Sequence, residues 1–149
     1  MATVEPGEAF SPGYFYVQFS DLNVVAFREV SGISSENDVI LQHQVNKEGK
    51  ATYVKVAGKL TWQNLVLKKG VDTDMSLWKW RNTIITEGVD GKRKNGEIYV
   101  MDITGKQKTT WKVINAWPCN YVVGPLVPDG NEALLEEIHL AHEGLERVK

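Results

Sequence analysis

Short runs of aromatic and β-branched residues, each closed by a turn signal, constrain the fold of this chain more than any other feature. Side chains of these two kinds fit the pleated surface of a sheet, so such runs are typical of strands. The predicted strands are residues 14–19, 24–30, 38–45, 59–68, 97–103 and 109–117. Gly105 lies in the turn between the last two, and Pro118 is predicted to end the last because proline cannot donate a ladder hydrogen bond. The sequence therefore predicts a mainly β protein.

One segment has the spacing of a helix. Its apolar residues recur at intervals of three and four in two adjacent stripes, Leu77, Trp80 and Ile84, and then Trp78 and Ile85. Asp72 or Asp74 can cap the first turn, and Gly88 is placed to end the helix. Tryptophans bury large areas, so we expect this helix to plug one end of a β-sandwich. The predicted core positions are Trp62, Leu77, Trp78, Trp80, Ile84, Trp111 and Trp117.

The segment 131–143 allows two interpretations. Leu134, Ile138, Ala141 and the following Leu145 have helical spacing, and Gly144 could end a helix there. An alternating pattern, with Leu134, Ile138 and Leu140 on one face, predicts a strand instead. The pattern alone does not decide between helix and strand.

Length and composition exclude several classes of protein. The 149 residues predict a single domain, 1–149, in which residues 1–12, with two prolines, form an extended N-terminal arm. One cysteine excludes an internal disulfide framework and a cysteine-rich zinc site. The chain has no secretory signal pattern and no apolar run of the roughly 20 residues that a membrane span needs. We therefore expect no membrane partner and assembly in the cytoplasm.

The charges are segregated along the chain although they nearly cancel overall. Residues 1–38 carry six acidic residues against Arg28, a balance of −5, and residues 129–149 carry six against two basic residues, a balance of −4. The overall charge of −2 thus leaves +7 for residues 39–128. Such segregation allows one copy to present complementary surfaces to the next, unless folding mixes the charges into an even surface.

No catalytic or metal-binding constellation can be nominated from the sequence. His139 and His142 would share a face on a helix but point to opposite faces of a strand, and a third metal ligand is not evident. The segment 88–96 is rich in glycine and lysine but lacks the order of a phosphate-binding loop, so a solvated basic turn is the simpler interpretation. We expect a protein that is not an enzyme and that needs no cofactor.

Three blocks of sequence resemble the tube proteins of contractile phage tails, including the tube subunits of extracellular contractile injection systems. The first block is 27–36 followed by 39–45, and the second is Leu65-Val-Leu-Lys-Lys-Gly70 before Leu77-Trp-Lys-Trp80. The third is Trp111 to Tyr121, which contains Asn-Ala-Trp-Pro, followed by Asn131 to Glu146, which contains Leu-Ala-His-Glu-Gly-Leu-Glu. In this order the blocks span most of the chain.

The resemblance implies an antiparallel β-sandwich or barrel with one flanking α-helix, in which 131–143 is a strand. It implies that six copies close into a ring and that rings stack into a hollow tube. The implied partners are further copies of the chain, a contractile sheath protein, baseplate and terminator proteins, and a cargo of DNA or effector protein in the lumen. The protein would then be part of a phage virion or of an injection particle.

The same resemblance suggests which residues make the contacts of a tube. The polar segment 44–58 is predicted to be an extended loop against a neighbouring subunit and ring, with Lys47, Glu48, Lys50 and Lys55 as contact residues. The strands on either side of it, 37–45 and 59–68, are predicted to line the lumen through Gln42, Gln44, Thr61 and Gln63, which are polar and uncharged. The alternative function is a ligand- or carbohydrate-binding β-sandwich with exposed tryptophans as stacking platforms.

Overall fold

Strands make up most of the computed structural model, which describes residues 12–128 and 133–149. In chain order the elements are β1 Pro12–Phe19, β2 Val25–Phe27, β3 Glu29–Ser31, β4 Ser35–Val45, β5 Ala51–Trp62, β6 Leu65–Gly70, α1 Ser76–Glu87, β7 Lys94–Asp102, β8 Gln107–Val123, β9 Leu135–Ala141 and β10 Gly144–Arg147. All paired strands are antiparallel. The mainly β fold with one flanking helix is therefore confirmed; the sheet forms a sandwich rather than a closed barrel.

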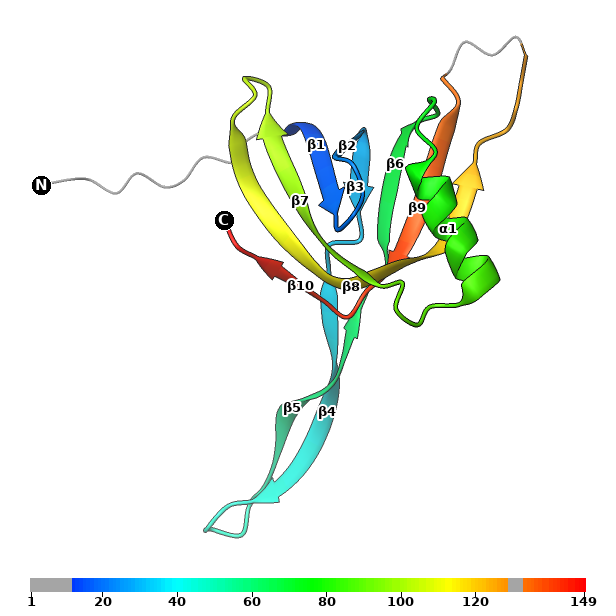
Figure 1. The fold of residues 1–149 in the computed structure, drawn as a ribbon. Helices are drawn as coiled ribbons and strands as arrows, with labels where there is room; N and C mark the ends of the chain where they lie inside the picture. Colours follow the sequence, from blue (N-terminus) through cyan, green and yellow to red (C-terminus); the bar gives the residue numbers. More distant parts are fainter. Residues whose placement is uncertain (1–11, 129–132) are drawn as a thin grey trace, which may run out of the picture.

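The body of the molecule is one sheet folded into two facing walls. Its strand order is β2-β1-β7-β8-β9-β6-β3, and β10 also pairs with β8. The long strand β8 belongs to both walls, because its first part pairs with β7 and β10 and its last part, from Trp117, pairs with β9. Figure 1 shows β8 curving from one wall to the other, and α1 packs against β8. Asn115, with a positive φ of 50°, lies at this transition.

Alternation along the strands builds the core between the walls. In β6, Leu65 and Leu67 are fully buried while Val66 between them is half-buried, and β9 repeats the pattern with Ile138 and Leu140. Successive side chains of a strand point to opposite faces, so this alternation fixes the register of each strand. The helix adds Leu77, Trp80 and Ile84 to the buried set, and the rings of Trp80 and Phe19 lie 5.1 Å apart.

The predicted end of strand β8 is wrong. The strand does not end at Pro118 but continues to Val123, and Pro118 lies opposite Leu140 of β9. The register shifts between Pro118 and Asn120, so the proline occupies an irregularity of the ladder, where a missing donor is tolerated. Its carbonyl oxygen accepts a hydrogen bond from the Arg81 guanidinium at 3.2 Å, which ties α1 to the strand.

Two other segments differ from their local patterns. The predicted strand 24–30 is divided into β2 and β3, which pair with β1 and β6 and so belong to different walls. Within the segment 131–143, Leu135–Ala141 forms strand β9, as the family resemblance implied, and the helical interpretation of its spacing is wrong. The predicted N-terminal arm and residues 131–132 lie outside the described residues, except that Pro12 begins β1.

A buried polar cluster joins the end of β6 to the start of β9. The Lys69 ammonium lies 2.9 Å from the Glu136 carboxylate and 3.1 Å from Asp72, and both Lys69 and Glu136 are buried. Burial lowers the pKa of Lys69, but hydrogen bonds and charges of Glu136 and Asp72 outweigh it, so the pKa is raised. The Tyr121 hydroxyl donates to Glu136, and burial together with this bond raises the tyrosine pKa. The charged and polar groups of the cluster are therefore paired with one another inside the fold.

Candidate functional site

The hairpin of β4 and β5 is the part of the molecule that the body does not cover. The two strands pair with each other and with no other strand among the described residues. Figure 1 shows the hairpin extending away from the body. Every residue of β4 is exposed, and large apolar side chains on both strands face solvent: Val39, Ile40, Leu41, Val45, Tyr53, Val54 and Leu60. A two-stranded ribbon of this kind is marginally stable in water and leaves two outer edges with unpaired backbone groups.

The hairpin overturns the prediction of a long polar loop. Residues 44–58 were expected to be an extended loop, but Ala51 already begins β5 and only Asn46 to Lys50 form the turn. The Asn46 side chain holds the turn, because its Oδ1 accepts hydrogen bonds from the amides of Glu48 at 3.0 Å and Lys50 at 2.8 Å. Gly49 has a positive φ of 77°, which glycine adopts without strain.

Three of the four predicted contact residues lie at the tip of this hairpin. Lys47, Glu48 and Lys50 belong to the turn and are exposed, whereas Lys55 lies within β5, opposite Leu41. The tip therefore presents two ammonium groups and one carboxylate at the end of a long projection. Their contact with a neighbouring ring stays a prediction.

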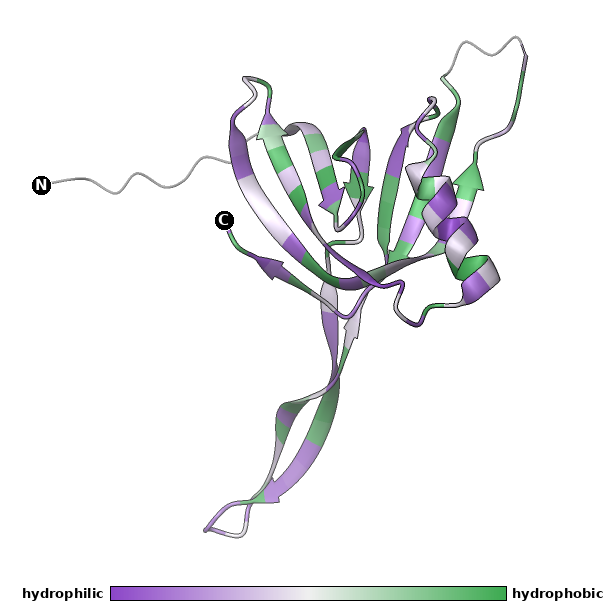
Figure 2. Ribbon diagram, in the orientation of Figure 1, coloured by the Kyte–Doolittle hydropathy of each residue, from purple (hydrophilic) through white to green (hydrophobic). Residues whose placement is uncertain are grey.

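Both faces of the hairpin carry a mixture of apolar and polar side chains. On one face the register places Val39 opposite Ala57, Leu41 opposite Lys55, and His43 opposite Tyr53. The rings of His43 and Tyr53 lie edge to face at 5.3 Å. The other face carries the cross-strand pairs Ile40 with Val56, Gln42 with Val54, and Gln44 with Thr52. Figure 2 shows hydrophobic and hydrophilic segments side by side along both strands.

The four predicted lumen residues do not form one row. Gln42 and Gln44 share a face, but Thr61 lies opposite Glu36, beyond a register shift between Asn37 and Val39. Gln63 follows the end of β5 and lies at the base of the hairpin. All four are exposed, and their orientation towards a lumen stays a prediction.

The tryptophans are mostly covered, which bears on the alternative function. Trp80 is buried, Trp62, Trp111 and Trp117 are half-buried, and Trp78 is 44% exposed. The prediction of a core position is therefore wrong for Trp78, whose ring stays largely open to solvent while it packs edge to face with Tyr121, with the ring centroids 5.4 Å apart. A platform on which sugars stack would need several exposed tryptophan rings, whereas Trp78 alone of the five tryptophans is exposed.

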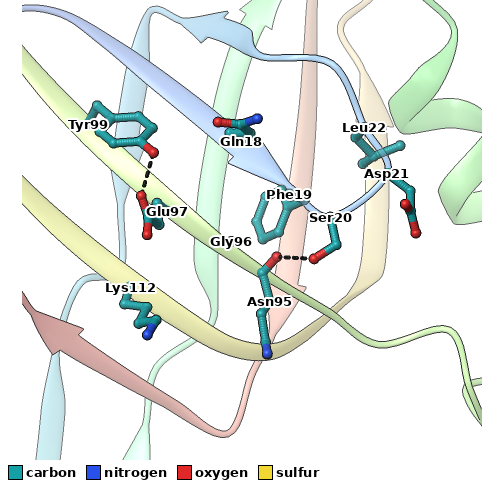
Figure 3. A pocket seen from close by; sticks show the side chains of 10 residues that line it. All are labelled: Gln18, Phe19, Ser20, Asp21, Leu22, Asn95, Gly96, Glu97, Tyr99 and Lys112. Atoms are coloured by element: carbon teal, nitrogen blue, oxygen red, sulfur yellow. Dashed lines mark hydrogen bonds between the residues drawn. The ribbon is translucent and has the colours of Figure 1, made fainter.

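A polar hollow lies on the outer face of the sheet, over β1, β7 and β8 (Figure 3). Tyr99 donates to Glu97, which raises the tyrosine pKa, and Ser20 donates to the carbonyl oxygen of Asn95 at 3.1 Å. Glu97 lies opposite Lys112 in the register. The hollow holds no nucleophile paired with a base, and its hydrogen bonds are those of a solvated sheet face.

The two C-terminal histidines do not share a site. His139 contacts Glu137 at 2.6 Å, whereas His142 contacts the backbone carbonyl of Gln63 at 2.8 Å. Within residues 12–128 and 133–149 no three histidine, cysteine or carboxylate side chains gather as metal ligands. In the same ranges no helix is long and apolar enough to cross a membrane.

Known proteins resemble the chain in both sequence and fold. A tube protein in the extended sheath–tube complex of the PVC extracellular contractile injection system superposes with a TM-score of 0.77 at 25% identity, covering 93% of this chain and 90% of that one. The sheath/tube terminator structure of the same system gives a TM-score of 0.76 at 25% identity, covering 99% and 100%. Hcp1 from Flavobacterium johnsoniae shares the fold with a TM-score of 0.59 at 11% identity, covering 91% and 94%. No curated protein matches the chain.

The family assignment rests on the sequence itself. Residues 11–146 match the family described as T4-like virus tail tube protein gp19, which includes all three blocks that carried the resemblance. The match reaches from the first described strand to the last, so it covers the hairpin as well as the body. The chain belongs to this family of tail tube proteins.

Proposed function

We propose that this chain is the structural subunit of the inner tube of a contractile tail or injection system, with six copies in each ring and rings stacked into a hollow tube. The observation that carries the proposal is the β4–β5 hairpin, whose two faces and two edges are uncovered in the single subunit. Burying such a surface against other copies removes the unpaired edges and supplies the missing apolar contacts.

Lateral contacts within a ring use the free edges of the body and of the hairpin. Among the described strands, β10 pairs only with β8, and β2 and β3, at the ends of the sheet order, have three residues each. These edges leave backbone donors and acceptors for strands of a neighbouring copy. A head-to-tail contact of this kind closes into a ring when its rotation fits and otherwise continues as a filament.

Contacts between rings use the hairpin tip. Lys47 and Lys50 lie in the exposed turn of the hairpin, and acidic residues outnumber basic ones in both terminal segments of the sequence. Complementary charges on the surfaces of two copies favour stacking, and salt weakens such exposed contacts. Gln42, Gln44, Thr61 and Gln63 face the lumen in this proposal, because uncharged side chains do not retain a charged cargo.

The partners proposed for the tube are a contractile sheath, a baseplate and a terminator. Support comes from the structures that this fold resembles, which include a sheath–tube complex, a baseplate and a sheath/tube terminator. The cargo in the lumen is DNA or an effector protein. The role is structural, without catalysis or a cofactor, and the tube assembles in the cytoplasm before it enters a virion or an injection particle.

Negative-stain electron microscopy of the purified chain tests the proposal. We expect rings with sixfold symmetry or stacked tubes, alone or when a preassembled baseplate is added. Light scattering that shows only a 16.7 kDa monomer at high concentration, also with the baseplate, would reject it.

A further inference from the structure

The hairpin meets the body at a small socket, which we define as Gly32, Trp62, Gln63, His142 and Gly144. The Nε2 atom of His142 lies 2.8 Å from the carbonyl oxygen of Gln63, directly after β5. The imidazole also lies against the Trp62 indole, with ring centroids 5.9 Å apart. A Cβ added at Gly144 would stand 3.8 Å from the same indole, so the backbone of Gly144 forms the floor beneath Trp62.

The opposite side of the socket is backbone. Gly32 has a positive φ of 87°, and a Cβ at this position would lie 2.0 Å from the carbonyl oxygen of Asn64. No side chain can occupy that space, so the chain passes Gly32 closely as it leaves the hairpin. The Asn64 amide reaches Cys119 of β8 at 3.7 Å. The hairpin base thus lies between the close backbone at Gly32 and the His142 imidazole, with a further contact from Asn64 to Cys119.

His142 is placed for this contact by a break in the C-terminal strand. Strands β9 and β10 both run along β8, and residues 142 and 143 separate them. The amide of Glu143 donates to the carbonyl oxygen of Ile114 at 2.9 Å, which holds the break next to the bend of β8 at Asn115. The break lets His142 turn towards the hairpin instead of continuing the alternation of β9.

The hydrogen bond of His142 has a defined direction. A carbonyl oxygen can only accept, so Nε2 carries the proton and donates it to Gln63. The other ring nitrogen, Nδ1, is buried and has no hydrogen-bond partner among the described residues. The imidazole therefore makes one directed polar contact, to the hairpin base, while its ring packs on Trp62.

We propose that His142 is a positioning residue, which fixes the angle at which the β4–β5 hairpin leaves the body. The 11 residues of β4 rise about 3.3 Å each, so a tilt of about 10° at the base moves the tip by roughly 6 Å. A shift of that size is larger than a hydrogen bond or an ion pair tolerates. That the angle matters for assembly rests on the proposed function. The proposal that His142 fixes the angle does not depend on that function.

A distance measurement with spin labels tests the role of His142. Labels are attached at Lys47→Cys on the hairpin tip and Asn82→Cys on α1, in a chain with Cys119→Ser, diluted with unlabelled chain. His142→Leu keeps the volume but removes the donor, and His142→Gln retains an N–H group near the position of Nε2. His139→Leu is the control, because that imidazole contacts Glu137 and not the hairpin.

We expect a narrow distribution of label-to-label distances in the labelled chain with His142 intact and in the His139→Leu control. The distribution should be clearly broader in His142→Leu and should narrow again in His142→Gln. Thermal unfolding of the variants, followed by circular dichroism, separates loss of the angle from loss of the fold. A distribution in folded His142→Leu as narrow as the reference would overturn the proposal, and so would equal broadening in His142→Leu and His142→Gln. Tube formation is scored separately by microscopy, so failure of the proposed function leaves a distinct result.

Discussion

The two-walled body and the β4–β5 hairpin are built from the same strand-forming residues, yet their surroundings are opposite. In the body, Leu67 and Ile138 are paired neighbours that are 0% and 1% exposed, whereas Leu41 and Tyr53 of the hairpin are 63% and 71% exposed. Apolar side chains in the first environment stabilise the subunit, because folding removes them from water. Those in the second contribute nothing until another chain covers them. Under the proposed function, this difference separates residues that fold the subunit from residues that assemble it.

The largest expected effect is in the body, at the buried pair of Lys69 and Glu136. Removing one partner of a buried ion pair costs about 3–5 kcal/mol, because the other charge stays buried without compensation. Lys69→Met should therefore lower the free energy of unfolding by this amount in urea denaturation. Lys68→Met is the matched control: its contact with Glu29 at 3.0 Å is partly exposed, and solvent-exposed pairs contribute little to stability.

The double variant Lys69→Met with Glu136→Gln completes this test. Neutralising the remaining carboxylate should restore part of the lost stability. Equal losses in Lys69→Met and Lys68→Met would show that the cluster between β6 and β9 is not a buried, coupled pair.

A pair of leucines sharpens the comparison between body and hairpin. Leu67→Ala should lower the free energy of unfolding by about 2–5 kcal/mol, the range for removing a fully buried leucine side chain. Leu41→Ala should change it by less than about 0.5 kcal/mol, because the side chain is already exposed in the subunit. Sedimentation should then show fewer tubes for Leu41→Ala. A hairpin variant that destabilises the single subunit as strongly as the core variant would contradict the division.

The smallest effect concerns two turns with the same hydrogen bonds. Asp102, before the turn into β8, accepts from the amides of Thr104 and Lys106, at the same spacing at which Asn46 accepts from Glu48 and Lys50. Hydrogen bonds from the Thr104 side chain and then from backbone amides lower the pKa of Asp102 from 3.8 to about 2. Because the folded pKa is depressed, this contribution to stability is present above about pH 4 and is lost as the pH falls through about 2.

The urea midpoint measured between about pH 4 and about pH 2 should therefore fall less in Asp102→Asn than in the wild type. The neutral Asn46 turn makes no such contribution. Asn46→Asp should introduce an acid-dependent opening that hydrogen exchange locates in the hairpin. An unchanged acid profile in Asp102→Asn would show that this carboxylate does not stabilise the turn.

The sequence predicts the body better than the hairpin for a physical reason. Burial on one face produces alternation, and it made β1, β7 and the first part of β8 recognisable. The hairpin has no such asymmetry, because Val54 and Thr52 lie on one face and Tyr53 and Lys55 on the other, all exposed. Segment 44–58 therefore resembled a polar loop. In the proposed tube its covering surface belongs to other copies, so no burial pattern within the strands reveals it.

Other errors came from contacts that no local pattern contains. Pro118 continues a strand because the irregular register opposite Leu140 needs no donor there. Trp78 shares the helix with Trp80 but packs only partly against the sheet, at Tyr121, and stays 44% exposed. The spacing of Ile138, Ala141 and Leu145 mimicked a helix, although the ladders of β9 and β10 with β8 decide the structure. The contact of His142 with the hairpin base joins residues 79 positions apart and could not be predicted from spacing.

Hydrogen exchange of the chain in assembled tubes and in the dissociated subunit tests most directly whether the hairpin is the assembly surface. Amides of β6 and β9, which pair with each other in the body, should be protected in both states. Amides on the outer edges of β4 and β5 should exchange rapidly in the subunit and become protected in the tube. Equally rapid exchange of the hairpin in intact tubes would contradict the account, because neighbouring copies would then leave its edges and faces uncovered.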